Sequence, residues 1–181
     1  VAEVPMLGLS ALVLLAGSAH GWSILEIKDP VVVSSDRTIT RSSVITFVGD
    51  LGRIEVGLNA TLTIEGALNA PPVPIFSGLG RVRFTSGLTR EIVPQWWGAV
   101  GDNATDDTAA LQSALDSLSE HGRLVLPAGE YLVSKTLELG GGAEVSGDGA
   151  TLRARADKGD QLAALLAGPA SAAPEALPAL L

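Results

Sequence analysis

Between positions 24 and 84, the apolar residues fall into short runs of β-forming residues that turn residues separate. The runs are 31–33, 44–47, 54–56, 62–64 and 82–84. In 61–65 and 81–84 polar and apolar residues alternate, which places Leu62 with Ile64, and Val82 with Phe84, on one face of a strand. Such short strands favour a solenoid, in which each coil covers the apolar face of the next. A β-sandwich is the alternative, but no Asn-Gly or Asp-Gly hairpin turn joins any two of these runs.

One later segment has the periodicity of a helix instead. Apolar residues recur at helical spacing from Ala110 to Leu118, with polar residues between them. Thr105 is a suitable N-cap, and Asp106 and Asp107 would then lie in the first turn, where the helix dipole favours anions. Gly122 would follow the last turn. A short helix with one apolar face needs a surface to cover, so we predict that it caps the end of a stack of strands.

Five more short strands are predicted after the helix. They are 124–126, 131–133, 136–139, 143–145 and 151–153, with glycine-rich turns between them. From residue 156 onward the sequence is rich in Ala, Leu and Pro and has no strand alternation. We predict that this tail is disordered or is not native to the β-structure.

The block around the helix resembles a known family. The residues that carry the resemblance are Trp97-Gly98-Ala99-Val100-Gly101-Asp102, Thr105-Asp106-Asp107-Thr108, the Leu126-Pro127-Ala128-Gly129 turn with Tyr131, and Gly147-Asp148-Gly149-Ala150-Thr151-Leu152. This pattern is similar to the N-terminal portion of the pectate lyase superfamily, in the rhamnogalacturonase- and epimerase-like branch that also includes many phage tailspikes. The resemblance covers roughly residues 91–154. It implies an all-β fold, the N-terminal coils of a right-handed parallel β-helix with a short capping α-helix.

Four segments are predicted along the chain. Residues 1–21 are like a signal peptide, because the apolar run 6–16 would span only about 16 Å as a helix, short of a bilayer core of ~30 Å. Cleavage would fall near Ala19, although no Lys or Arg precedes the run, and a buried apolar strand or helix is the alternative. Residues 22–90 form β-rich leader coils, 91–155 the pectate lyase-like start with its helix, and 156–181 the tail. We therefore expect a secreted, periplasmic or extracellular protein.

Charge and composition restrict the partners. The net charge of −8 and a pI near 4.6 argue against nucleic acid, because the chain lacks the basic surface that replaces counterions around phosphates. The chain has no cysteine, so neither disulfides nor thiolate metal sites contribute. We expect a polysaccharide partner and no stable membrane span, and a homo-oligomer remains open.

Candidate site residues are few. Trp96, Trp97 and Tyr131 could stack on sugar rings, although packing in the interior is the favoured interpretation for all three. Asp102, Asp106 and Asp107 could bind calcium, which the resemblance also admits. The favoured role of these aspartates is structural, as an Asx-turn and as helix N-terminal anions. No other cofactor is evident, and no catalytic residue can be assigned.

The resemblance implies the N-terminal part of a secreted protein that acts on uronic-acid-containing glycans, as a polysaccharide lyase or glycoside hydrolase if it is an enzyme. Its catalytic coils are expected to be missing from this chain. The alternatives are a non-catalytic carbohydrate-binding or tailspike-like attachment module, or a purely structural N-terminal domain.

Overall fold

The computed structural model describes residues 23–155 apart from 86–87, 120 and 141–143. It also describes the backbone of two short strands, β1 (Val13–Leu15) and β18 (Leu166–Ala167). Apart from these two strands, the predicted signal peptide and the predicted tail lie outside the described residues. The four segment boundaries therefore stay predictions.

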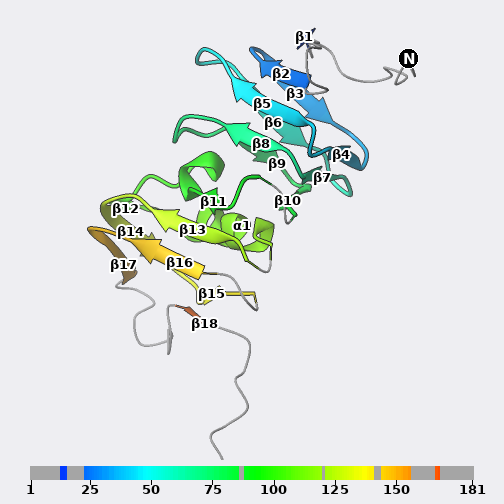
Figure 1. The fold of residues 1–181 in the computed structure, drawn as a ribbon. Coiled ribbons are helices and arrows are strands. Elements are labelled where there is room, and N and C mark those ends of the chain that lie inside the picture. Colours follow the sequence, from blue (N-terminus) through cyan, green and yellow to red (C-terminus); the bar gives the residue numbers. More distant parts are fainter. Residues whose placement is uncertain are drawn as a thin grey trace, which may run out of the picture.

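The first three coils stack three parallel sheets (Figure 1). Their strands are β2 (Ser23–Ile27), β3 (Pro30–Val33) and β4 (Arg37–Ile39), then β5 (Ser43–Phe47), β6 (Arg53–Val56) and β7 (Thr61–Ile64), then β8 (Ala67–Asn69), β9 (Phe76–Gly78) and β10 (Arg81–Phe84). The sheets are β2-β5-β8, β3-β6-β9 and β4-β7-β10, so each strand pairs with its counterpart about one coil away. β1 pairs with β2 and is antiparallel.

The fourth coil replaces strands with helices. It contains β11 (Glu91–Ile92), the 3₁₀-helix η1 (Pro94–Trp97), β12 (Asp102–Asp106) and α1 (Thr108–Ser117). The next coils contain β13 (Arg123–Leu126), β14 (Gly129–Val133), β15 (Leu137–Glu138), β16 (Glu144–Gly147), β17 (Ala150–Ala154) and β18. These strands form the parallel sheets β11-β13-β16, β12-β14-β17 and β15-β18. Helix α1 takes the place of a third strand and contacts β10 on one side and β15 on the other.

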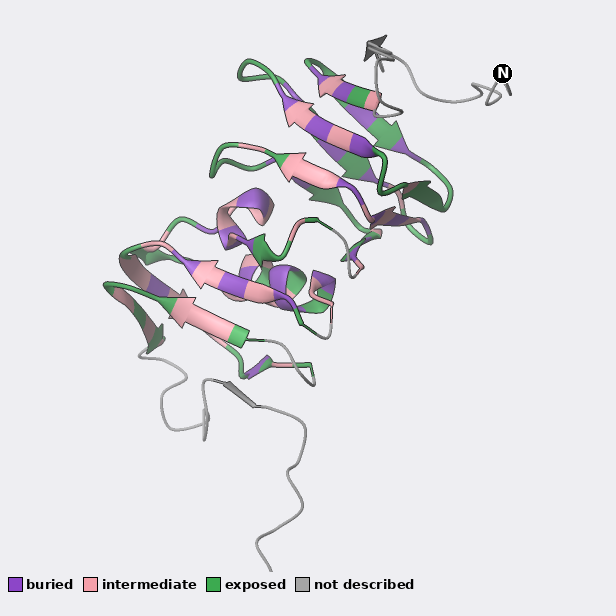
Figure 2. Ribbon diagram, viewed as in Figure 1, coloured by how far each residue is buried: buried purple, intermediate pink, exposed green. Residues whose placement is uncertain are grey.

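The core follows from the register of the coils. Leu25, Ile45 and Leu68 stack in one ladder, and Val31, Ile54 and Phe76 stack in another. Buried positions alternate with half-buried or exposed ones along β5, β6 and β7 (Figure 2). Burying a large apolar side chain contributes about 1.5–3 kcal/mol. The inward ladders therefore fix the register, because a shift by one residue would expose them all.

The apolar interior is divided into two clusters, which meet within the fourth coil. The first extends from Leu25 to Trp96, and the second from Ala99 to Leu137. Trp97 and Leu118 pack against both clusters. Aromatic rings gather at this junction, where Phe76 lies 5.1 Å from Trp97 and Phe84 lies 6.1 Å from Trp96 between ring centroids.

The predicted fold class is confirmed: the described strands form an all-β parallel β-helix with one short α-helix. Every predicted strand overlaps an observed one. The helix covers the end of a stack of strands, as predicted. It lies between two stacks, because three strand-built coils that end at β10 precede it and the coils with β15 follow it.

The predicted start of the helix is wrong. Thr105 lies in β12, and the N-cap of α1 is Asp107. Residues of β12 pair in parallel with β14, which keeps the backbone extended until Asp106. The helix also ends earlier than predicted, at Ser117, where Leu118 returns to extended backbone.

Candidate functional site

The loop between η1 and β12 is organised by the Asp107 carboxylate. The Val100 N–H donates to its Oδ1 at 2.7 Å, and the Gly101 N–H donates to its Oδ2 at 3.0 Å. Asp107 is almost fully buried, with 1% of its surface exposed. Although it occupies the N-cap position, its side chain makes no bond to the helix amides. Both of its oxygens are committed to the loop backbone.

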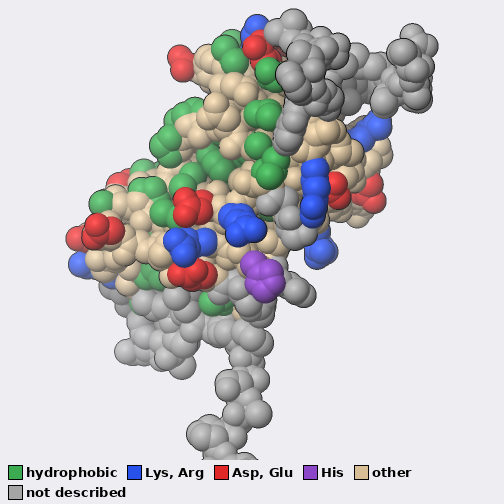
Figure 3. Space-filling model, viewed as in Figure 1, with side chains coloured by type: hydrophobic (Ala, Val, Ile, Leu, Met, Phe, Trp, Pro, Cys, Tyr) green, Lys and Arg blue, Asp and Glu red, His purple; other side chains and the backbone are tan. Residues whose placement is uncertain are grey.

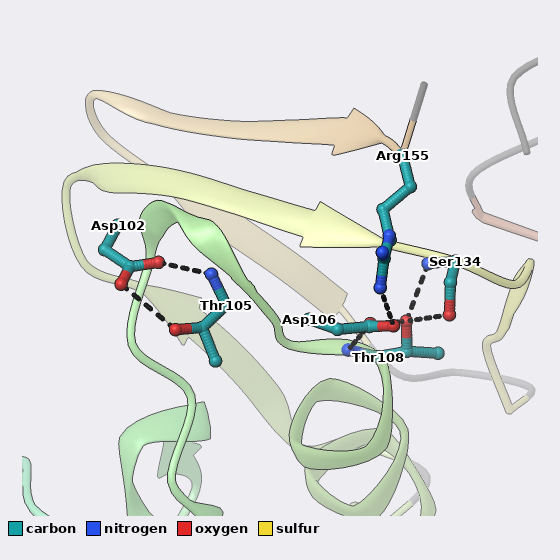
Figure 4. A network of polar contacts seen from close by, with 6 residues as sticks. All are labelled: Asp102, Thr105, Asp106, Thr108, Ser134 and Arg155. Carbon is teal, nitrogen blue, oxygen red and sulfur yellow. Dashed lines mark hydrogen bonds and ion pairs between the residues drawn. The ribbon is translucent and has the colours of Figure 1, made fainter. Parts of the chain in front are cut away.

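Asp102 and Asp106 serve neighbouring parts of the same segment (Figure 4). Asp102 accepts the N–H groups of Ala104 and Thr105 through Oδ1, and the Thr105 hydroxyl donates to its Oδ2. These bonds to Thr105 and Ala104 lower the pKa of Asp102. The predicted Asx-type role of Asp102 therefore matches the geometry.

Asp106 joins the start of α1 to the next coils. Its Oδ1 accepts the N–H and the hydroxyl of Thr108, and its Oδ2 lies 3.6 Å from a guanidinium nitrogen of Arg155. Burial raises its pKa, but the bonds from Thr108 and Ser134 and the nearby Arg155 charge outweigh that effect and hold the pKa at about 2. The Ser134 N–H donates in turn to the Thr108 hydroxyl at 2.8 Å.

This loop does not fit a calcium ion. Calcium needs six to eight oxygen ligands that converge on one point, whereas the three carboxylates each bind a different part of the backbone. Within the described ranges, no group of three or more His, Cys, Asp or Glu side chains is arranged to hold a metal ion. The geometry supports a structural role for Asp102, Asp106 and Asp107. The predicted place of Asp106 and Asp107 in the first helical turn is wrong, because Asp106 ends β12 and Asp107 is the N-cap residue.

The predicted aromatic residues occupy different environments. Trp96 is 5% exposed, and its indole N–H donates to the Pro71 carbonyl at 3.1 Å. Tyr131 is 1% exposed. Trp97 is half-buried and is the member of this set with ring surface at a cleft. Packing thus accounts for Trp96 and Tyr131, whereas Trp97 also faces solvent.

The Tyr131 hydroxyl links two coils. It donates to the Pro127 carbonyl at 2.8 Å and accepts a bond from Gln95 Nε2 at 2.8 Å. Burial raises the pKa of Tyr131, the Gln95 bond lowers it, and the negative charge of Asp107 raises it; the net shift is upward. The side chain is therefore a neutral structural link between η1 and β14.

A cleft that the sequence reasoning missed lies between β10 and α1. It encloses about 480 Å³ and continues into a second hollow of about 390 Å³, and both hollows are lined by Arg83, Asp116 and Leu118. Phe76, Arg81 and Trp97 line the first hollow, and His121 lines the second. The available signal was the alternation in 81–84, which turns both arginines outward because Val82 and Phe84 point inward. The cleft itself depends on where α1 packs.

The face over β13 and β16 carries charges of both signs (Figure 3). Arg123 lies between Glu91, at 3.6 Å, and Glu144, at 3.1 Å, in register along the sheet. These side chains are well exposed, so each pair contributes at most about 1 kcal/mol. The ladder supports the register of the coils.

The part of the chain that the structure describes contains no helix with the length and apolarity needed to cross a bilayer.

Comparison with known proteins finds a family that part of the chain resembles. Residues 95–168 match the family model described as rhamnogalacturonase A/epimerase, pectate lyase-like. The match begins in η1 and covers β12, α1 and the coils after them. No solved structure matches the chain significantly.

Three curated relatives show similarity over parts of the chain. A capsule K3-specific depolymerase of Klebsiella phage KP32 is 34% identical over 95 residues, or 42% of this chain and 11% of the relative. The mannuronan C5-epimerase AlgE1 of Azotobacter vinelandii is 47% identical over 58 residues, or 31% of this chain and 4% of the relative. Rhamnogalacturonase A of Aspergillus niger is 30% identical over 105 residues, or 57% of this chain and 22% of the relative.

The chain thus spans less than a quarter of the length of each of these relatives. The family match and the parallel coils agree with each other and with the sequence motifs from Trp97 to Leu152. Residues 95–168 of the chain are therefore similar to the rhamnogalacturonase A/epimerase, pectate lyase-like family.

Proposed function

We propose that this chain forms the N-terminal coils of a secreted protein that acts on uronic-acid-containing polysaccharides. The observation that carries the proposal is the family match, which coincides with α1 and the coils that follow it. Secretion is supported by the apolar segment 6–16 and its small flanking residues.

The names of the relatives support a polysaccharide as the common substrate class. They describe a capsule depolymerase, a mannuronan epimerase and a rhamnogalacturonase, which carry out different reactions. Two of the three names specify uronic-acid polymers. Proteins that share one fold but differ in their active-site residues can act on the same class of polymer by different reactions.

The groups that act on the polymer belong, in this proposal, to coils other than the six described. Hydrolysis requires two carboxyl groups that flank the scissile bond, and elimination requires a free base. In the matched block, Asp102, Asp106 and Asp107 are occupied by the backbone, by hydroxyls and by Arg155. Their role is to build the loop before α1, on which later coils stack.

A non-catalytic binding or attachment role is the second candidate. The partly exposed Trp97 in the cleft between β10 and α1 favours it. A rigid stack of coils that presents a glycan-binding cleft would serve such a role without any catalytic group.

The test uses the full chain with polygalacturonate, alginate and a neutral glucan. Polymer length, unsaturated products and uronate configuration are followed by size-exclusion chromatography, ultraviolet absorbance and NMR, and retention is followed on immobilised polymers. Each assay is run with added calcium and with a chelator, because calcium bound at some other surface remains part of the proposal. We expect retention on acidic polymers without a change in polymer length. Cleavage by this chain would overturn the location of the catalytic groups, and retention on no acidic polymer would overturn the polysaccharide function.

A further inference from the structure

The cleft between β10 and α1 arises where a helix replaces a strand. A strand lies about 4.8 Å from its neighbour, whereas a helix with its side chains is about 10–12 Å wide. β10 pairs with β7 and with no other strand of the described coils. The helix contacts β10 but cannot continue its ladder, so space remains beside the strand. The two hollows of about 480 and 390 Å³ lie there and have the size of small-ligand sites.

The strand side of the cleft is cationic. Arg81 and Arg83 are both exposed, and they stand about 7 Å apart on the same face of β10. No ion pair joins either guanidinium to another side chain in the described ranges. In a chain with a net charge of −8, these two guanidinium groups make the strand side of the cleft locally positive, and Asp116 of α1 contributes one negative charge to the same lining.

The remaining walls supply groups that suit a sugar. Trp97 and Phe76, whose ring centroids are 5.1 Å apart, form an aromatic side of the first hollow. Ser113 and Asp116 of α1 also line this hollow, where they can bind hydroxyl groups. Asp116 already accepts a bond from Gln112 at 2.8 Å, which holds its side chain in place.

We propose that this cleft binds a carboxylated sugar unit of an acidic glycan, with Arg81 and Arg83 paired to the carboxylate. A guanidinium forms two parallel hydrogen bonds to a carboxylate, which gives both affinity and orientation. The proposal rests on the proposed function for the choice of a glycan. It adds a subsite whose strand side, β10, precedes the matched family block and whose helix side, α1, lies within that block.

The test measures binding of an oligogalacturonate to the full chain by isothermal titration calorimetry. The variants are Arg81→Gln, Arg83→Gln and their double variant, with Arg53→Gln as the matched control. Arg53 is also exposed, lies on β6 in another sheet, and loses the same single charge. The uncharged oligomer of galactose serves as the ligand control. Thermal unfolding of each variant shows whether the fold is retained.

We expect each cleft variant to weaken binding severalfold, the double variant about tenfold or more, and Arg53→Gln to have little effect. Binding of the neutral oligomer should be much weaker, and rising salt should weaken binding of the acidic one. Equal affinity of the double variant and the unmodified chain for the oligogalacturonate would overturn the cleft as the binding site. The polysaccharide function would still stand in that case, because the chain would still bind the acidic oligomer. If this oligomer does not bind but immobilised acidic polymers retain the chain, the cleft proposal alone fails. If neither binds, both proposals fail.

Discussion

Gly101 lies directly against the ring of Tyr131. A Cβ atom added at Gly101 would approach Cε1 and Cζ of the ring to 3.0 Å, and the glycine has a φ of +67°. The ring cannot move aside freely, because its hydroxyl is bonded to both Gln95 and Pro127. This contact joins the loop before β12 to β14, the second strand of the next coil.

Gly101→Ala should therefore destabilise the protein more than an alanine at a comparable but open glycine. Gly49 is the matched control, since its φ is +76° and nothing lies within 4 Å of an added Cβ. We expect a loss of about 1 kcal/mol for Gly49→Ala from backbone strain alone. For Gly101→Ala we expect about 2–4 kcal/mol, because overpacking against the ring adds to that strain. Urea unfolding measures the free energy of unfolding of both variants. Equal losses of stability would contradict the prediction, because they would mean that the Tyr131 ring moves aside at little cost.

Asp107→Ala should be among the most damaging single changes in the loop. It removes an almost fully buried carboxylate and with it the acceptor of two backbone N–H groups, those of Val100 and Gly101. We expect a loss of about 2–4 kcal/mol, because hydrogen bonds to a charged group contribute more than neutral ones. Asp116→Ala, on the exposed face of α1, should change the unfolding free energy by about 0.5 kcal/mol or less. Similar losses for the two variants in chemical denaturation would contradict the assigned role of Asp107.

The titration of Tyr131 can be observed directly, because it is the single tyrosine of the chain. Burial and the nearby Asp107 charge raise its pKa above the ordinary value of 10.0. A raised pKa means that the unfolded chain loses the proton first, so stability is full below pH 10 and falls as the pH rises beyond it. Phenolate absorbance should have its midpoint above 10 in the folded protein and return to the ordinary value in denaturant. A midpoint at or below 10 in the folded protein would contradict the buried position of the ring.

Asp106 should contribute to acid stability. Its pKa falls from 3.8 to about 2 in the folded state, so the folded protein holds this proton more weakly than the unfolded chain. The resulting stability is present above pH 4 and is lost as the pH falls through 2. About a third of the side chain is exposed, so after discounting for solvent screening we expect about 1 kcal/mol or less. The stability difference from Asp106→Asn should therefore shrink between pH 4 and pH 2, and a constant difference in urea unfolding would contradict it.

The strands that could be predicted from sequence are those with β-branched or alternating residues. Residues 44–47 and 62–64 are examples, because their own side chains define the inward face. β8 and β9 were missed, since Ala67–Asn69 and Phe76–Gly78 are short and contain residues with weak strand preference. Their extended form depends on pairing with β5 and β6 in the preceding coil, which is tertiary information.

The prediction of where α1 starts was wrong for a related reason. Thr105 has the chemistry of an N-cap residue. However, it lies in β12, which pairs with β14, and the Thr105 hydroxyl donates to Asp102. The pairing of β12 with β14 overrode the local preference of Thr105, and the apolar spacing that predicts the helix contains no signal for this strand. The cleft was also out of reach, because Arg81 and Asp116 meet across a space that only the packing of α1 creates.

The division of the interior into two clusters has a consequence for cooperativity. Trp97 and Leu118 are the side chains shared by both clusters of the described residues, so few apolar contacts transmit stability across the fourth coil. In a stack where each coil contacts only its neighbours, a weak interface separates the molecule into units that can open independently. Amides of β5 and of β14 should therefore exchange hydrogen with different opening free energies. A fold of this kind can gain or lose coils on one side of α1 while the other side keeps its own stability.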